Sequence, residues 1–561
     1  MKLKVTVTNE SQNRIFCRIV LQALTSGLSG NVGSRTEKVY CPGEHEFEAE
    51  AGLYKVSVHR GKLYQPFHGR IELTGKDAVL EVLLKELVDA RGLGLYSFDA
   101  HSHVSRDEVL ETGNLLNASV IMKGEGFNFF FAGSPYDHET HLQYLNKNFT
   151  DTAPYRVKYT AVMDQVKDRG FILDIGNELV KCRYGHVFMM NYLQCPPFSL
   201  YYDHEFDPWL FTKEGEEPEY RIPCIHEAVQ RERGENSVAV CAHPTSWWWH
   251  DNGEFITNIA VTLGFEMLAG SIDALVVMGY RSDNDSYLEL WYDALKNGYF
   301  LPGIAEMDSA YDTVPEDHLS FKTYTYIDRF DIDSLCKAVK EGKNLVTSGP
   351  VIQMKVNGRL PGAVLEYAKD EQFAVELEAF RCYQALLSKV QIIVNGEVYK
   401  EYAVCLDSFE AAETVSVDRD SFILAKCCDF HGNVAFTNPV YLRNRPFVNK
   451  GYLSDVNITV LKGGRPAEGM YWLDEDGGKI RFKGVIQLKM KVSSAVSIEV
   501  DGQIKVIRLF ERKELQDIFK NLYFGRFNTD KAYKPGEVPA EEFKLARIRD
   551  ILDHVDMKIE F

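Results

Sequence analysis

Two histidines stand two positions apart behind an aspartate in the stretch FDAHSHVSR, which begins at Phe98. The run that contains the start of this stretch, LYSFDAH, predicts a β-strand, so Asp99, His101 and His103 are expected on one face at the strand's end. Two imidazoles on one face can bind one divalent metal ion. An HxH motif is also compatible with ordinary surface or core histidines, so the metal hypothesis needs further ligands.

Ligand-type residues also mark the ends of three further apolar runs. Glu178 ends GFILDIGNE, and His186 begins the next run, GHVFMMN; His243 ends SVAVCAHP, and Asp308 ends FLPGIAEMD. Each residue has an ordinary alternative, such as a strand or turn cap for His243 and Asp308, or an ion pair with Lys181 or Arg183 for Glu178. The joint pattern is more specific than any member, because reactive residues of βα barrels lie where strands end.

The elements that would position these residues fall into four segments. Residues 94–345 alternate apolar strands with helix-like pieces, which predicts parallel βα units and a closed βα barrel. Residues 1–93 are short strand-like runs between Gly, Pro and Asn turns, which predicts a small β-sandwich. Residues 346–450 predict a second β-sandwich. Residues 451–561 predict a β-rich segment that ends in an amphipathic helix, PAEEFKLARIRDILDHV.

Composition narrows the class of partner. The chain has 561 residues and a formal net charge of −18, so it repels polyanions and nucleic acid is not expected as a partner. Its 11 cysteines show no CxxC spacing, which favours reduced thiols and a cytoplasmic location. No run of about 18 apolar residues occurs and the start of the chain has no apolar signal core, so no membrane association is expected.

The HxH, E…GH, HP and D elements, in this order, resemble the polymerase and histidinol phosphatase (PHP) superfamily of metal-dependent hydrolases, in its CehA/McbA-like branch. The resemblance runs from about residue 50 to residue 360 and includes VDARGLGLYSFDAHSHVS, GNELVKCRYGHVFMMN, VAVCAHP, GIAEMDS and GKNLVTSGPVIQMKVNG. It implies a distorted (β/α)7 barrel flanked by antiparallel β-sandwich domains.

The same resemblance implies a centre of two divalent transition metals, Zn, Mn or Fe, without an organic cofactor. One metal would take His101, His103, Glu178 and Asp308; the other would take Glu178, His186 and His243, with Glu178 bridging.

The third metal site of the superfamily is where this chain departs. Pro135 lies in GSPY, which replaces the expected TDH step, Ala310 replaces a histidine, and Ser105 stands where another histidine can occur. All three losses fall on one metal, which favours a dinuclear centre. His138 and His141 in YDHETH could compensate, although such a pair is more often a solvated loop.

The expected chemistry is activation of water against a phosphoester, carbamate or related ester bond of a small molecule. Glu178, Asp308 and Arg183 are the candidate catalytic residues. The candidate substrate-binding residues are Arg106, Lys123, Arg281 and Trp247, the last from a TSWWWH stretch that could stack a flat group.

Two other classes of function stay open at this point. One is a non-catalytic protein that keeps its metals for structure, which the altered third site favours. The other is a carbohydrate- or partner-binding protein, which the flanking sandwiches and the Trp triplet favour. A homo-oligomer is possible in each case.

Overall fold

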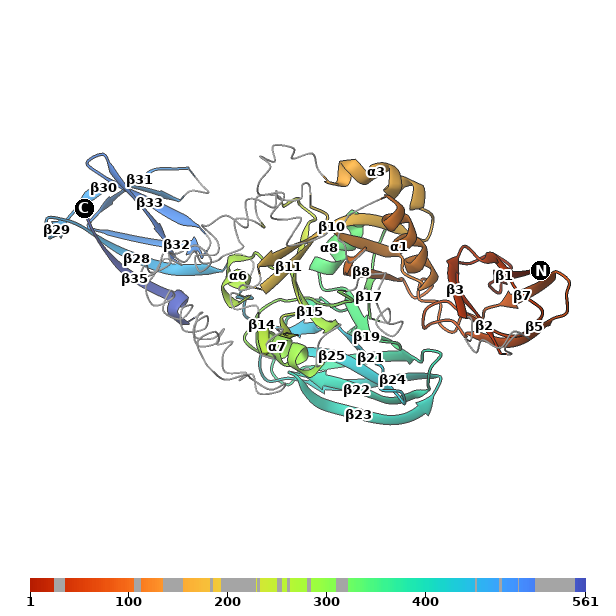
Figure 1. Cartoon of the computed structure of the whole chain (residues 1–561). Coiled ribbons are helices and arrows are strands. Elements are labelled where there is room, and N and C mark those ends of the chain that lie inside the picture. The colour runs from red at the N-terminus through yellow and green to blue at the C-terminus, as the bar shows by residue number, and fades with distance from the viewer. Residues whose placement is uncertain are drawn as a thin grey trace.

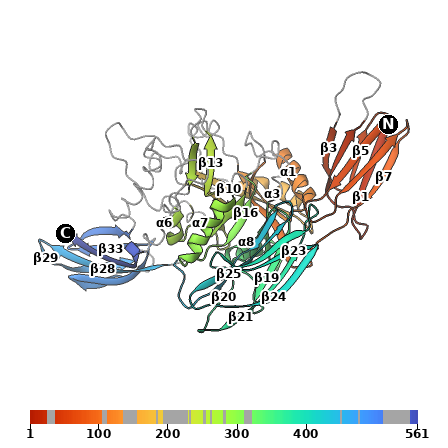
Figure 2. The ribbon, with the colours of Figure 1, turned by 90° about the horizontal axis from the view of Figure 1, so that it is seen from below.

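The computed structural model of the chain describes residues 1–24, 36–104, 112–134, 155–181, 185–192, 229, 233–249, 255–259, 263–279, 284–308, 321–448, 452–473, 477–492, 494–509 and 550–561. Within these residues 54% lie in strands and 14% in helices. An N-terminal β-domain and a C-terminal β-sheet lie on either side of a central part (Figures 1 and 2).

The N-terminal domain is a β-sandwich, as predicted, but it is not purely antiparallel, because its first and last strands pair in parallel. Its two sheets have the strand orders β4-β1-β7 and β3-β2-β5-β6. In β1 every second residue, Leu3, Val5 and Val7, is buried, because alternate side chains of a strand point to opposite faces. The strands are β1 (Lys2–Thr8), β2 (Cys17–Ala23), β3 (Thr36–Cys41), β4 (Glu44–Glu48), β5 (Gly52–His59), β6 (Phe67–Leu73) and β7 (Ala78–Leu83).

The central part is built on one long mixed sheet, whose first strands in order are β16-β15-β12-β11-β10-β9-β8-β17-β18. These strands are β8 (Leu95–His103), β9 (Phe129–Ser134), β10 (Ile172–Lys181), β11 (Gly185–Met190), β12 (Val238–Ala242), β15 (Ala274–Gly279), β16 (Gly303–Glu306), β17 (Lys322–Tyr326) and β18 (Asn344–Thr347). The helices are α1 (Thr112–Gly124), α3 (Tyr155–Val166), α6 (Leu263–Ala269), α7 (Asn284–Lys296) and α8 (Ile332–Lys340). A separate hairpin pairs β13 (Thr245–Trp249) with β14 (Phe255–Ile259).

The predicted (β/α)7 barrel is wrong, and with it the TIM-like description of the central part. β8, β9 and β10 are parallel, but β11 is antiparallel to both β10 and β12, and β17 is antiparallel to β8. Only residues 182–184 separate β10 from β11. Because a parallel crossover needs about a dozen residues or more, β10 and β11 can only pair as an antiparallel hairpin.

The central sheet curves so that its β16 end approaches β8. The backbone N–H of Asp308 donates to the carbonyl of His101 at 2.9 Å, and the backbone N–H of Ala305 donates to the hydroxyl of Thr323 at 2.7 Å. The C-terminal ends of β8 and β16 therefore lie side by side, although about 200 residues separate them in the sequence.

The next segment forms a second β-sandwich, but one of its sheets continues the central sheet. β18 pairs with β26, and the order runs on through β26-β25-β22-β23. The other sheet has the order β19-β21-β24, and Ile352, Val375, Val390 and Ile423 are among the residues buried between the two sheets. The strands are β19 (Val351–Val356), β20 (Val364–Leu365), β21 (Gln372–Phe380), β22 (Leu387–Val394), β23 (Glu397–Leu406), β24 (Ser408–Ser416), β25 (Ser421–Asp429), β26 (Val434–Thr437) and β27 (Val440–Leu442).

The C-terminal segment is an eight-stranded sheet in which the last strand, β35, pairs in parallel with β28. The predicted terminal helix is partly wrong, because its last two residues, His554 and Val555, begin β35. No helix among the residues given above is long and apolar enough to cross a membrane. The strands are β28 (Leu453–Lys462), β29 (Arg465–Pro466), β30 (Glu468–Leu473), β31 (Ile480–Lys483), β32 (Val485–Lys491), β33 (Ala495–Val500), β34 (Gln503–Arg508) and β35 (His554–Glu560).

Candidate metal centre

Four of the predicted ligands meet at the C-terminal ends of β8, β12 and β16. Asp308 is the common neighbour: its Oδ1 lies 3.6 Å from His101 Nε2 and 3.5 Å from His103 Nε2, and its Oδ2 lies 3.9 Å from His243 Nε2. Ligand atoms of His101, His243 and Asp308 all lie within 4.8 Å of one another. These residues come from three distant segments, so the fold, not local sequence, brings them together.

The distances among these groups fit a single small cation. Separations of 3.5–3.9 Å between imidazole nitrogen and carboxylate oxygen are longer than a hydrogen bond. Two ligands that each lie about 2.0–2.1 Å from a tetrahedral Zn²⁺ are about 3.3 Å apart. Imidazole and carboxylate donors suit Zn, Mn or Fe better than Ca or Mg. Among the described residues, the ligand distances mark a place for one metal ion.

Glu306, a buried residue of β16, orients two of the histidines. Its Oε2 lies 2.8 Å from His101 Nδ1, and its Oε1 accepts the backbone N–H of His243 at 2.9 Å. When the carboxylate of Glu306 is ionised it can only accept, and His101 then donates from Nδ1. The lone pair of His101 is then on Nε2, the atom that faces Asp308. A carboxylate behind a ligating imidazole is the usual support of a metal-binding histidine.

Sequence reasoning missed Glu306. It stands two positions before Asp308 in GIAEMD, and alternate residues of a strand share a face. A glutamate within an otherwise apolar strand was the available signal, because buried carboxylates are rare unless they have a partner.

The backbone is strained at two of the ligands. His243 has a φ of 23° and Asp308 a φ of 43°, and each follows directly or closely on a strand. Non-glycine residues seldom adopt positive φ, and such strain clusters at functional sites. The strained backbone therefore occurs at two of the residues whose ligand atoms the distances bring together.

Asp99 lies behind this cluster, on the same strand as His101. The backbone N–H of His101 lies 3.4 Å from Asp99 Oδ1, and burial raises the pKa of the Asp99 carboxyl to about 6. The ring of Phe188, from β11, lies 4.9 Å from the ring of His101. A carboxyl and an aromatic ring thus enclose His101 within the sheet.

His186 and Glu178, the predicted ligands of a second metal, lie next to this cluster in the sheet. The buried ring of His186 contacts the ring of His243, with centroids 4.7 Å apart. In the ladder between β10 and β11, Val180 pairs with His186 and Glu178 pairs with Phe188. The backbone of Glu178 is therefore near the cluster, and the position of its side chain lies outside what the structure describes.

Lys123, a predicted substrate-binding residue, is engaged elsewhere. In the last turn of α1, its Nζ donates to the carbonyl of Val166 and to Asp168 Oδ2, both at 2.6 Å. The same ammonium lies 4.9 Å from the centre of the Phe16 ring, which belongs to the N-terminal sandwich. The ammonium group of Lys123 therefore links α1 to the segment before β10 and to the N-terminal domain through these contacts.

Several other predicted residues lie outside the described part of the chain. The backbone of Trp247 is in β13, but its side chain is not among those described. The remaining ones are Arg106, Arg183, Arg281, His138, His141, Ser105, Pro135 and Ala310.

Comparison with known proteins gives no assignment of family. No family model matches the chain, and no curated protein is similar to it. Among solved structures, PsfC from Pseudomonas syringae is 11% identical over 44% of this chain and 88% of its own, with a TM-score of 0.26.

Two further solved structures are similar at a lower level. BcpA, the major pilin subunit of Bacillus cereus, is 11% identical over 30% of this chain and 65% of its own, with a TM-score of 0.12. A calcium-binding mutant of beta-glucuronidase 2 from Bacteroides uniformis is 9% identical over 88% of this chain and 75% of its own, with a TM-score of 0.18. Likenesses this weak carry no conclusion about fold or function.

Proposed function

We propose that this protein is a metal-dependent hydrolase that cleaves a phosphoester, carbamate or related ester bond of a small molecule. The observation that carries the proposal is the convergence of His101, His103 and His243 on Asp308, with Glu306 behind two of them. Such a set of imidazole and carboxylate donors is typical of sites that bind Zn, Mn or Fe.

The exposure of the ligands favours a catalytic over a purely structural metal. The side chains of His101 and His243 are 1% and 3% exposed, whereas those of His103 and Asp308 are 15% and 12% exposed. One side of the cluster is therefore closed and the other can be reached from outside. Structural zinc sites are closed by four protein ligands, whereas a catalytic ion keeps a position for water or substrate. With four protein ligands here, a catalytic cation would take water or substrate as a fifth ligand on the exposed side.

The residues of the chain have distinct roles in the proposed reaction. His101, His103, His243 and Asp308 would hold the cation, and the more exposed pair would border the substrate. Glu306 keeps the Nδ1 proton of His101 in place, so that Nε2 faces the cation. When bound, a divalent ion of this kind supplies Lewis acidity that activates water near neutral pH. Asp308 is also placed to accept a proton from an attacking water.

The proposal is tested by metal content and turnover on the same preparation. The full chain, purified without chelator, is analysed for bound metals and assayed with bis-p-nitrophenyl phosphate and p-nitrophenyl acetate in the presence of Mn²⁺ or Zn²⁺. We expect bound metal and measurable turnover in the wild type. We expect His103→Ala and Asp308→Asn to abolish the turnover. His431→Ala is the matched control, because His431 is exposed on the turn between β25 and β26.

Two outcomes would contradict the proposal. Bound metal without turnover on a broad panel of esters, phosphoesters and carbamates would leave a structural metal. Turnover that survives Asp308→Asn at the wild-type rate would place the chemistry elsewhere in the chain.

A further inference from the structure

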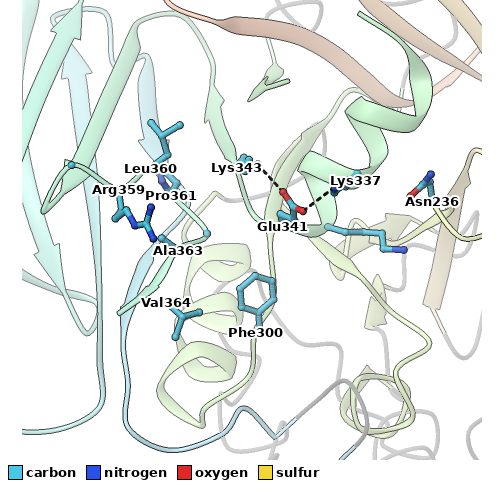
Figure 3. A pocket seen from close by; sticks show the side chains of 13 residues that line it. Asn236, Phe300, Lys337, Glu341, Lys343, Arg359, Leu360, Pro361, Ala363 and Val364 are labelled. Carbon is cyan, nitrogen blue, oxygen red and sulfur yellow. Dashed lines mark ion pairs between the residues drawn. The ribbon is translucent and has the colours of Figure 1, made fainter. Parts of the chain in front are cut away.

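A groove of about 690 Å³ lies between the C-terminal end of α8 and the segment 357–364 (Figure 3). Its charged lining consists of four cationic side chains and one carboxylate, although the whole chain has a net charge of −18. Positive charge is therefore concentrated here against the overall balance. The charged residues are Lys337, Lys340, Lys343, Arg359 and Glu341.

Helix stability explains only part of this charge. Lys337 and Lys340 lie in the last turn of α8, where cations complement the negative end of the helix dipole. Arg359 comes from a different element: the turn at Asn357 and Gly358, whose φ values are 47° and 72°, reverses the chain after β19. The dipole of α8 does not explain why a fourth cation lines the opposite wall of the groove.

A close backbone contact fixes the two walls relative to each other. A Cβ atom on Gly362 would lie 1.9 Å from the carbonyl oxygen of Glu341, and Gly362 has a φ of 84°. Gly342 contacts Gly362 as well, because a Cβ atom on Gly342 would lie 3.3 Å from the Cα of Gly362. Only glycine allows this approach and this backbone conformation. The groove is therefore a preformed feature of the fold.

The carboxylate of Glu341 neutralises only part of the charge. It lies 2.8 Å from Lys343 Nζ and 4.0 Å from Lys337 Nζ, so two ammonium groups share it. Lys340 donates to the backbone carbonyl of Glu235 at 2.8 Å. Exposed pairs of this kind are weak, so an incoming anion can compete with Glu341 for both lysines.

An apolar wall adjoins the cations. Val364 is 50% exposed, and Leu360 and Pro361 lie on the same side of the groove as Arg359 (Figure 3). Phe300, at the base, is buried against Tyr441, with ring centroids 5.1 Å apart. A ligand that uses both parts of the lining has anionic groups at one end and an uncharged group at the other.

We propose that this groove binds a small organic phosphate, with its phosphate groups among Lys337, Lys343 and Arg359 and its uncharged part against Val364. Lysine ammonium groups and an arginine guanidinium are the usual protein partners of phosphate. The volume lies within the range of about 300–1,000 Å³ that small-molecule sites occupy.

The groove is separate from the metal centre. Asn236, which lines the groove, stands two residues before β12, and His243 stands directly after it. At about 3.3 Å per residue, the two ends of this strand segment are on the order of 20 Å apart. Binding in the groove therefore does not depend on the proposed hydrolysis.

The test is binding of adenosine diphosphate and of inorganic pyrophosphate to the full chain by isothermal titration calorimetry at low ionic strength. The protein is dialysed against EDTA first, so that phosphate cannot bind through a metal. Both probes are expected to bind, the nucleotide more tightly, and higher salt should weaken both. The double variant K337Q/R359Q should weaken binding about tenfold or more, because two charge-assisted contacts are lost.

A variant that should tighten binding distinguishes a direct effect on the groove from misfolding, because misfolding would only weaken binding. Glu341→Gln removes the competing carboxylate and keeps its shape, so it should tighten binding. Lys369→Gln, an exposed lysine outside the groove, is the matched control and should leave affinity unchanged. Absence of binding by either probe at millimolar concentration, or equal affinity in all variants, would overturn the proposal. Tighter binding of pyrophosphate than of the nucleotide would remove the role of the apolar wall.

Discussion

Replacing Glu306 by glutamine should weaken metal binding without removing any metal ligand. In the native protein the Glu306 carboxylate accepts from His101 Nδ1 at 2.8 Å and from the backbone N–H of His243 at 2.9 Å. The glutamine oxygen can replace one carboxylate oxygen, but its NH₂ group cannot accept. If the oxygen stays with the His243 N–H, the NH₂ group faces His101 Nδ1, which must then accept.

The consequence is a change of tautomer at His101. An Nδ1 that accepts requires the proton on Nε2, and Nε2 is the atom that lies 3.6 Å from Asp308. A protonated Nε2 cannot bind a cation. Loss of such a supporting carboxylate typically costs 10–100-fold in metal affinity, or about 1.4–2.8 kcal/mol. We expect Glu306→Gln to lie at the upper end, because one substitution disturbs the support of two ligands.

Competition with a chromophoric Zn²⁺ chelator measures this loss directly and requires no turnover. Asp429→Asn is the matched control: Asp429 is also buried and accepts backbone N–H groups, those of His431 and Asn433 among them, but it lies on β25. Asp429→Asn should lower the free energy of unfolding and leave Zn²⁺ affinity unchanged. A folded Glu306→Gln protein that binds Zn²⁺ as tightly as the wild type would refute the role given to Glu306.

Three more predictions concern stability and thiol chemistry. Zn²⁺ at 1,000 times its Kd should raise the free energy of unfolding by about 4 kcal/mol in thermal melts; EDTA should reverse the gain, and a His243→Ala protein that shows the full gain would contradict the site. Burial lowers the pKa of Lys322 from 10.5 to about 7, so between these values the unfolded chain binds more protons than the folded protein. The free energy of unfolding should therefore rise with pH across this window. In urea unfolding of Lys322→Met, this free energy should depend less on pH than in the wild type. The same pH dependence in both proteins would count against the role of Lys322. The thiols of Cys17 and Cys41 lie 3.9 Å apart across paired strands, so diamide should join them and remove two titratable thiols per chain. A loss of two thiols in Cys17→Ser as well would disprove the pairing.

The expectation that His101, His103, His243 and Asp308 meet came from their places at the ends of apolar runs together with the resemblance to a family of metal-dependent hydrolases. Each follows or ends an apolar run, and such runs are easily identified as strands. In β1, where one face is buried, the alternation of Leu3 and its neighbours likewise predicted the sandwich strand correctly.

The direction of the strands could not be predicted in the same way. GFILDIGNE and GHVFMMN are both largely apolar because both strands lie inside the molecule, and such a run carries no alternation that distinguishes a parallel from an antiparallel neighbour. The three residues between β10 and β11 were the decisive signal, since they leave no room for a crossover helix. For Lys123, the partners come from distant segments, so nothing in its local sequence indicated them.

The strain at His243 and Asp308 connects the fold to the proposed chemistry. Residues held at unusual φ cost about 1–3 kcal/mol each, and glycine would relieve most of that cost. Two hydrogen bonds hold them: the N–H of His243 donates to Glu306, and the N–H of Asp308 donates to the carbonyl of His101. His101 also bonds Glu306 through Nδ1. The same few groups thus hold the strained backbone and direct the donor atoms toward one point. Stability of the fold alone does not require this arrangement, whereas binding of a cation does.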